Sequence, residues 1–398
     1  MKAGIDLGHR PEIGRLQQRC LMAGVLGGVL LGMGAFLQPD QFFRAYLMAF
    51  LFWLGVSIGC LAILMLQYLS GGGWGIIIRR LLEAATRVFP LMALLFIPLL
   101  FGLHRLYPWT HPDLVNASEV LKHKQFYLNV PFFIGRAVFY FAVWLVLSYL
   151  LNSWSSRQDE TADIGITRKL QVLSGPGIVL YGLTVSFAAI DWIMSLEPEW
   201  YSTIYGFLVM AGQALSAMAV IIAVLAMLAK QEPLASVVQP KHFQDLGKLM
   251  LTFVMLWAYM GFSQLLIIWS GDLPDEIPWY LRRFQGGWQK VGILLVVFQF
   301  ALPFALLLSR NLKRYSRTLV LVAGLVFIMR FVDLFWMTAP SFSVEGGKTH
   351  VSVSWMNIVA PVAIGGLWLA TFFWQLKRRP ILPLHEPYWE EEFATHTA

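Results

Sequence analysis

Ten segments of roughly 20 mostly apolar residues recur along the 398-residue chain. A helix needs about 20 residues to cross the 30 Å hydrocarbon core of a bilayer. Because a bilayer offers no water to backbone N–H and C=O groups, such segments must be helical. We expect spans at residues 17–37, 42–69, 88–104, 130–152, 172–194, 201–229, 246–269, 288–309, 318–338 and 356–376. The third contains Pro90 and Pro98 and should be kinked.

The charge content agrees with this interpretation. Only 13% of the residues are charged and 58% are hydrophobic, whereas a soluble domain carries about 25% charged residues. The fold class predicted is therefore an all-α, polytopic membrane protein. The net charge of +7 is better explained by loop charges that set the topology than by nucleic-acid binding.

The positions of the basic residues predict the orientation. Twenty lysines and arginines fall in segments on the side of the N-terminus and eight on the opposite side, while Arg136 and Arg330 lie within spans. Lysine and arginine are enriched in cytoplasmic loops. We therefore expect both termini to be cytoplasmic.

Two similar motifs indicate an internal duplication. Asp191 and Asp333 each lie near the end of a span, and each is followed seven residues later by a proline, Pro198 or Pro340. Spans two to five and six to nine are then two copies of a four-helix unit.

Charged residues within spans mark a candidate site, because each costs about 2.5–3.5 kcal/mol on insertion scales. Arg136 and Asp191 are expected at similar depth and are natural partners. Arg330 and Asp333 are three residues apart on one helix and are expected to pair. Glu197 should lie at the same outer side. These residues either form a proton-transfer or quinone site or make purely structural ion pairs.

The fifth span carries a polar stripe of Ser174, Tyr181, Thr184 and Asp191. The intervals of seven, three and seven residues keep these side chains on one helix face. The stripe is either a proton path ending at a carboxylate or a set of interhelical hydrogen bonds. His123 either lines the outer site or lies on the surface.

The sequence predicts no redox cofactor held by this chain. All eight histidines fall in loops, at span ends or in the termini, so none is placed to ligate a haem inside a bundle. Cys20 and Cys60 form no CxxC motif, which argues against an iron–sulfur cluster or a zinc site. A quinone remains a possible ligand. In the first span, Gly24, Gly28 and Gly32 predict a face for close helix packing.

Four stretches carry a resemblance to a known family: residues 191–203 (DWIMSLEPEWYST), residues 70–75 with Arg79 and Arg80, residues 127–129 before Arg136, and residues 269–277. They resemble the F subunits (ActF) of bacterial alternative complex III, a quinol:cytochrome c or electron-carrier oxidoreductase. Those subunits are similar to the NrfD-like membrane subunits of polysulfide reductases. The likeness covers nearly the whole chain, and residues 191–198 are its most specific part.

This resemblance implies a particular organisation. An N-terminus with a peripheral first helix (1–41) would precede two four-helix bundles (42–195 and 196–340), and a last helix and cytoplasmic tail (341–398) would follow. The implied partners are a sister ten-helix membrane subunit, multihaem c-type cytochrome subunits and an iron–sulfur protein, with haem and iron–sulfur clusters held by those partners. Quinone and lipids would be further ligands, and nucleic acid would not.

The resemblance also implies a location and a role. The chain would lie in the bacterial inner (cytoplasmic) membrane and contribute proton translocation, quinone binding or both. Two other interpretations stay open. A ten-span chain with charges inside the membrane could be a secondary transporter of a small solute, or a structural scaffold subunit without a ligand. The proteins that co-purify with the chain would distinguish these interpretations, because only a complex subunit should be inseparable from haem and iron–sulfur partners.

Overall fold

The computed structural model describes residues 11–342, 344–345, 348–383 and 385–386, and these are almost entirely helical. Within them, ten helical segments are long and apolar enough to cross a membrane, which confirms the predicted all-α polytopic fold. The spans are α1 (Pro11–Leu37), α2 (Pro39–Ser70), α3 (Gly73–Thr86) with α4 (Phe89–Phe101), α8 (Val130–Thr161), α9 (Gly165–Trp192), α10 (Tyr205–Leu228), α12 (Pro240–Gly271), α14 (Trp288–Leu295) with η5 (Val296–Ala301) and α15 (Leu302–Leu308), α17 (Ser316–Thr338), and α18 (Met356–Leu376).

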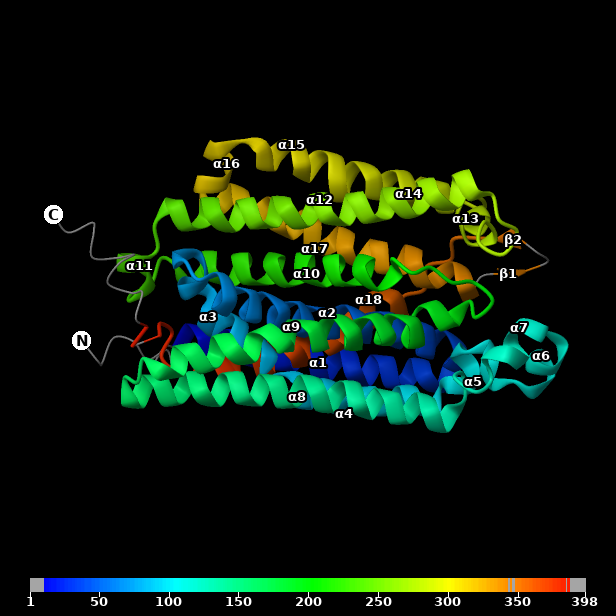
Figure 1. The fold of residues 1–398 in the computed structure, drawn as a ribbon, viewed down its shortest axis with the longest axis horizontal. Coiled ribbons are helices and arrows are strands. Elements are labelled where there is room, and N and C mark those ends of the chain that lie inside the picture. Colours follow the sequence, from blue (N-terminus) through cyan, green and yellow to red (C-terminus); the bar gives the residue numbers. More distant parts are fainter. Residues whose placement is uncertain (1–10, 343, 346–347, 384, 387–398) are drawn as a thin grey trace.

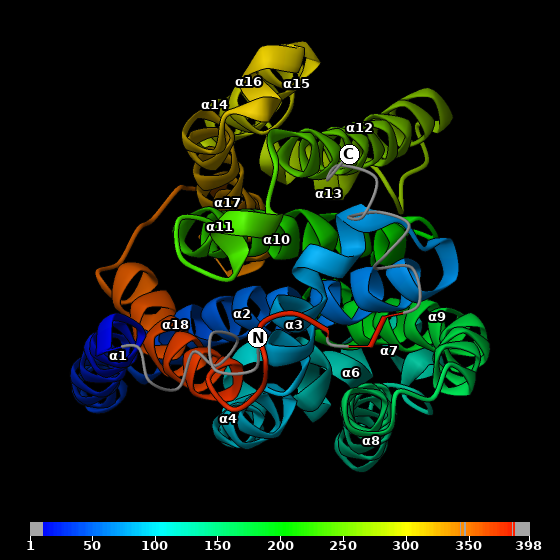
Figure 2. The same ribbon diagram turned by 90° about the vertical axis from the view of Figure 1, so that its left-hand side faces the viewer.

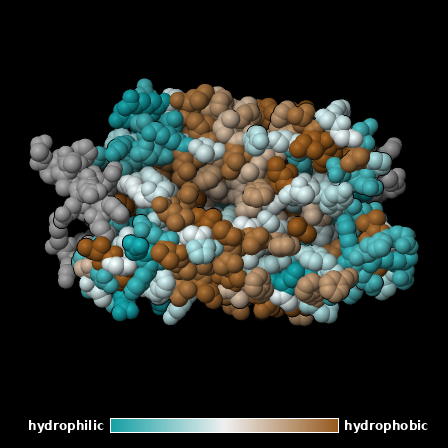
Figure 3. Space-filling model, viewed as in Figure 1, coloured by the Kyte–Doolittle hydropathy of each residue, from teal (hydrophilic) through white to brown (hydrophobic). Residues whose placement is uncertain are grey.

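The long helices run side by side, and the two ends of the molecule differ (Figure 1). One end, here called the loop-rich end, carries the short elements α5 (Leu103–Leu106), η3 (Pro108–Thr110), α6 (Pro112–Ala117), α7 (Glu119–Lys124), η4 (Met194–Leu196), α13 (Pro278–Arg283), η6 (Ala339–Phe342) and the hairpin β1 (Val344–Glu345) and β2 (Lys348–Thr349). The opposite end, the tail end, carries α11 (Leu234–Val237) and α16 (Arg310–Arg314). Hydrophobic side chains cover the middle of the surface and hydrophilic ones gather toward both ends (Figure 3), as a membrane protein requires.

Packing between the spans divides them into two bundles, with α1 and α18 side by side at one edge (Figure 2). In the first bundle α2 packs on α3, α4 and α9, and α8 packs on α4 and α9. In the second, α10 packs on α12 and α17, α12 on α15, and α14 on α17. Helix α10 also packs along α2 and α9 and so joins the bundles, while α1 and α18 pack on each other beside α2.

The third span differs from the predicted segment, residues 88–104. It begins at Gly73 and consists of two helices, α3 and α4, separated at Arg87 and Val88. Arg79, Arg80 and Glu83 lie in α3, and their charges lower its hydropathy so that it does not read as a membrane span. All three side chains are nevertheless buried in the first bundle. The interruption at residues 87–88 lies just before Pro90, which stands in the first turn of α4, while Pro98 lies inside that helix.

The glycine face predicted on α1 packs within this chain through one of its three residues. Gly24 lies against Gly366 and Leu367 of α18, but a Cβ on Gly28 or Gly32 would meet nothing within 4 Å. The buried residues of α1 include Gly24, Gly27, Leu31 and Gly34. At about 100° per residue, steps of three and four alternate to keep one side of a helix, whereas repeated steps of four drift around it by about 40° each.

Candidate functional site

Arg136 of α8 and Asp191 of α9 form a buried ion pair, as predicted. Arg136 Nε donates to Asp191 Oδ2 and Nη2 donates to Oδ1, both at 2.8 Å. Tyr140 Oη donates to Asp191 Oδ2 at 2.7 Å, and Arg136 Nη1 donates to the Tyr127 carbonyl at 2.8 Å. Two parallel bonds between a guanidinium and a carboxylate are the strongest geometry for such a pair. Both donors to the carboxylate lie on α8, so this helix orients Asp191 of α9.

Aromatic rings cover the charge of this pair. The Arg136 guanidinium carbon lies 3.8 Å from the centroid of the Tyr127 ring and 4.5 Å from that of Phe132. Cations are attracted to the faces of aromatic rings, and more strongly where water is excluded. Burial, and then the charge of Asp191, raise the pKa of the Tyr127 hydroxyl above its usual range, so Tyr127 stays neutral.

Helix α8 carries a buried stripe that the sequence analysis missed. Its members follow at steps of four residues and so turn around the helix by about 40° a step: Arg136, Tyr140, Trp144, Ser148 and Asn152. Trp144 Nε1 donates to Thr184 Oγ1 at 2.9 Å, and Ser148 Oγ donates to the Thr86 carbonyl at 3.0 Å. The spacing was visible in the sequence, but Trp144 between the polar residues hid the pattern. The stripe continues the polar interior from Asp191 toward the tail end.

A second buried carboxylate, Glu83 of α3, lies near the tail end of the same bundle. Its side chain is fully buried. Arg80 Nη1 donates to Glu83 Oε2 at 2.7 Å, and Ser155 Oγ of α8 donates to Oε1 at 2.6 Å. Arg80 also pairs with Asp159. The first bundle thus holds an arginine–carboxylate pair near each end, and both pairs are reached by side chains of α8.

The predicted stripe on α9 is buried along its length: Ser174, Tyr181, Thr184 and Asp191 all face the interior. Ser174 Oγ donates to the Leu170 carbonyl at 2.7 Å, and Thr184 Oγ1 donates to the Leu180 carbonyl at 2.7 Å. Thr184 in turn accepts the bond from Trp144. The α9 stripe therefore lines the same interior as the α8 stripe, on the neighbouring helix.

Glu197 lies at the loop-rich end in a separate cluster. Arg282 Nη1 donates to its Oε2 at 2.6 Å, Arg283 Nη2 to its Oε1 at 3.0 Å, and Ser341 Oγ to its Oε1 at 2.8 Å. Arg283 is fully buried and lies 3.5 Å from the Trp279 ring centroid. Burial lowers the pKa of Arg283, and Glu197 partly opposes that shift. Through this cluster the loop after α9 contacts α13 and η6. These contacts connect the first bundle to the second.

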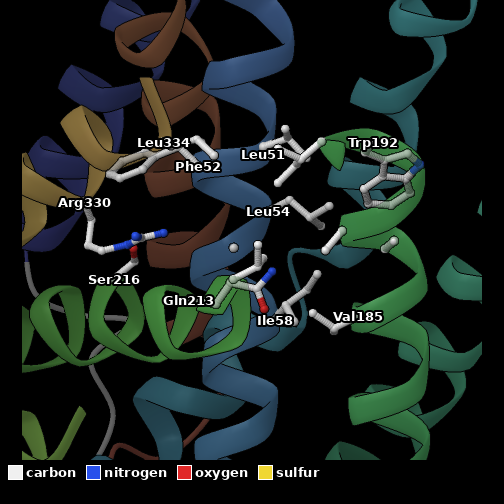
Figure 4. A pocket seen from close by; sticks show the side chains of 15 residues that line it. Leu51, Phe52, Leu54, Ile58, Val185, Trp192, Gln213, Ser216, Arg330 and Leu334 are labelled. Atoms are coloured by element: carbon white, nitrogen blue, oxygen red, sulfur yellow. The ribbon is translucent and has the colours of Figure 1, made fainter. Parts of the chain in front are cut away.

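Arg330 and Asp333 pair within α17, as predicted. Trp257 Nε1 of α12 donates to Asp333 Oδ2 at 3.0 Å. Arg330 Nε, by contrast, is buried without a hydrogen-bond partner among the described residues, and so is Gln213 Oε1 of α10. Both residues line a cavity of about 30 Å³ between α2, α9, α10 and α17 (Figure 4). That volume has room for one or two water molecules.

Other predicted residues fall outside these clusters. His123 is an exposed residue of α7, so it lies on the surface and not in a site. The described residues contain no group of three or more His, Cys, Asp or Glu side chains that could hold a metal ion. Cys20 and Cys60 are free thiols.

The fold and these clusters define an all-α, multi-pass membrane protein with arginine–carboxylate pairs buried inside its helical bundles. No protein-family model matches the chain, and no curated protein matches it.

Proposed function

We propose that this chain is a membrane subunit of a quinol:electron-carrier oxidoreductase of the alternative complex III type, and that its first bundle conducts protons. The chain would lie in the bacterial inner membrane beside a sister ten-helix subunit, multihaem c-type cytochromes and an iron–sulfur protein. Those partners would carry the haem and iron–sulfur clusters, and this subunit would transfer no electrons itself. The resemblance of residues 191–203 supports the choice of complex.

One observation carries the proton-conducting part: Asp191 and Glu83 are buried at opposite ends of a single bundle, with the α8 stripe between them. Their partners on α8, Tyr140 and Ser155, are fifteen residues apart, or about 22 Å along the helix. A buried carboxylate that can exchange a proton with hydroxyls and water is the usual element of a proton relay in membranes.

The middle of this path has the fewest polar groups. From Tyr140 to Ser148 the α8 stripe advances about 12 Å and offers only Trp144, which lies against Phe89 and Tyr140. Protons would cross this stretch on water that enters when the aromatic side chains move. The Arg136–Asp191 pair would then act as the gate on the loop-rich side, which the charge distribution predicts to be the outer one.

The first experiment is extraction of the tagged native chain in a mild detergent, followed by mass spectrometry and an optical spectrum. Co-purified c-type haem and an iron–sulfur protein would support membership of the complex. A colourless, solitary protein would contradict it and favour a transporter of a small solute. A protein that co-purifies with haem but whose variants below change assembly alone would be a scaffold.

The second experiment tests proton conduction with two variants of one helix. Tyr140→Phe removes the hydroxyl that donates to Asp191 but keeps the ion pair. Tyr149→Phe makes the same change on the exposed face of α8, where Tyr149 is 71% exposed. We expect Tyr140→Phe to lower the proton-to-electron ratio of the assembled complex and Tyr149→Phe to leave it unchanged. Equal ratios in both variants would contradict a path through Tyr140.

A further inference from the structure

A second cavity, of about 280 Å³, lies at the loop-rich end between the starts of α2 and α18 and the end of α17. None of its described lining residues belongs to α8. Its wall combines apolar side chains, such as Met48 and Phe335, with polar ones, among them Arg44, Thr338 and Asn357. Its described lining residues include no aspartate or glutamate. A cavity with one cation, several neutral polar groups and no acid favours an anionic ligand.

Among the lining residues that the structure describes, Arg44 is the only charged side chain apart from the titratable His350. Its Nε is buried and has no hydrogen-bond partner within the described part of the chain. Its guanidinium carbon lies 5.2 Å from the ring centroid of Phe342. The nearest acid in sequence, Asp40 one turn earlier on α2, pairs with Arg105 instead. Arg44 therefore differs from Arg136 and Arg283, whose charges are met by carboxylates.

The helices around Arg44 increase the positive potential. Arg44 lies in the second turn of α2, and Asn357 lies in the first turn of α18. The N-terminus of a helix carries a partial positive charge and attracts anions. A cation is disfavoured there unless a negative group is nearby. Gln41 Nε2 and the backbone N–H of Ser354 both donate to Asn357 Oδ1, which holds this amide in the wall.

We infer that this cavity binds a phosphate-class oxyanion, and that the natural ligand is the head group of an anionic phospholipid. Arg44 lies about 7 Å inside the start of the α2 span, which is the depth where lipid phosphates meet the hydrocarbon region. Arg44 would bind the phosphate oxygens, and the Met48 and Phe335 wall would take the adjoining glycerol and upper acyl carbons. This inference is independent of the proton path.

The test uses the purified protein, with any subunits that accompany it, in a neutral detergent. Native mass spectrometry would count the molecules of dioleoylphosphatidylglycerol or dioleoylphosphatidylcholine that remain bound. We expect the wild type to retain phosphatidylglycerol in preference. Arg44→Gln should weaken this binding about tenfold or more, because a charged hydrogen-bond partner is lost. Lys122→Gln is the matched control, since it removes one positive charge from the exposed surface of the same end.

A second variant tests the site independently, in case Arg44→Gln does not fold. Ser352 is an exposed residue of the cavity lining, so Ser352→Glu should fold normally and block the site with its own carboxylate. Loss of phosphatidylglycerol in both variants, with retention in Lys122→Gln, would support the inference. Equal retention of both lipids in all proteins would overturn it.

Thermal unfolding with inorganic phosphate separates the two sources of the oxyanion. Stabilisation of the wild type, but not of Arg44→Gln, by phosphate without any preference for phosphatidylglycerol would assign the site to a free anion. Stabilisation by neither phosphate nor phosphatidylglycerol would overturn the inference.

Discussion

Two of the arginine–carboxylate pairs within the spans are built differently. Arg136 and Asp191 come from neighbouring helices and meet through two hydrogen bonds, with Tyr140 as a third donor to the carboxylate. Arg330 and Asp333 come from a single helix turn, and Arg330 Nε lacks a hydrogen-bond partner among the described residues. The first pair joins two helices, and aromatic rings lie against its guanidinium. The second pair borders the cavity between the bundles.

This difference bears on what each pair can do. A buried ion pair with satisfied hydrogen bonds is rigid, and removing one partner leaves the other charge stranded. A buried donor that faces a cavity large enough for water has a partner available from solvent. The Arg136–Asp191 pair should therefore be important for stability, and the Arg330–Asp333 pair should be more tolerant of substitution.

The largest expected effect comes from Asp191→Asn. It leaves the Arg136 guanidinium buried without a counter-charge, which typically costs 3–5 kcal/mol, so we expect a loss of about that size. Asp333→Asn should cost clearly less, because Arg330 borders a cavity that can hold water. The measurement is the free energy of unfolding in mixed micelles. The double variant Arg136→Gln with Asp191→Asn should recover part of the loss; equal losses for Asp191→Asn and Asp333→Asn would break the comparison.

Trp257→Phe tests the one interhelical bond of the second pair. The indole N–H donates to Asp333 at 3.0 Å, and a hydrogen bond to a charged group contributes about 2 kcal/mol. We expect a loss of that order in the free energy of unfolding. Trp269→Phe on the same helix is the control, because Trp269 is exposed and its change should have little effect. A loss as large in the control would point to ring size instead of the hydrogen bond.

The smallest effect is expected from Gly212→Ala on α10. A Cβ at Gly212 would lie 2.1 Å from the Arg330 guanidinium carbon, so this group must move away from its position beside Asp333. The steric cost of about 1–3 kcal/mol is partly offset by the higher helix propensity of alanine, leaving about 1 kcal/mol. Gly182→Ala on α9, which meets nothing within 4 Å, should instead stabilise slightly. Thermal unfolding of both variants checks the sign.

The spans could be predicted well because a bilayer requires long apolar helices. Segments of that length without charged residues are easy to recognise in a sequence. The prediction failed at α3, where Arg79, Arg80 and Glu83 are charged yet buried through pairing. A hydropathy scale counts the cost of burying an unpaired charge. It takes no account of a partner that another helix supplies. The Arg330–Asp333 pair followed from helix geometry alone, since three residues place two side chains together.

The rest of the site depended on contacts between distant residues. Pairing of Arg136 with Asp191 was inferred from similar depth, but the part of Tyr140 needed the orientation of α8. Glu83 fell outside the predicted spans, and its partner Ser155 is 72 residues away. The cavity beside Arg44 also escaped prediction, since its walls come from α2, α17 and α18. Residue spacing predicts which side chains share a face of one helix, whereas these features are built by several helices.

The contact between α1 and α18 has a consequence for biosynthesis. Gly24 and Gly27 of α1 lie against Gly366, Leu367 and Ala363 of α18, so α1 meets this neighbour only after the spans between them have been synthesised. Until then α1 has lipid, or an insertion factor, along the face that α18 will occupy. Ribosome-bound chains that stop short of residue 356 should therefore hold α1 loosely.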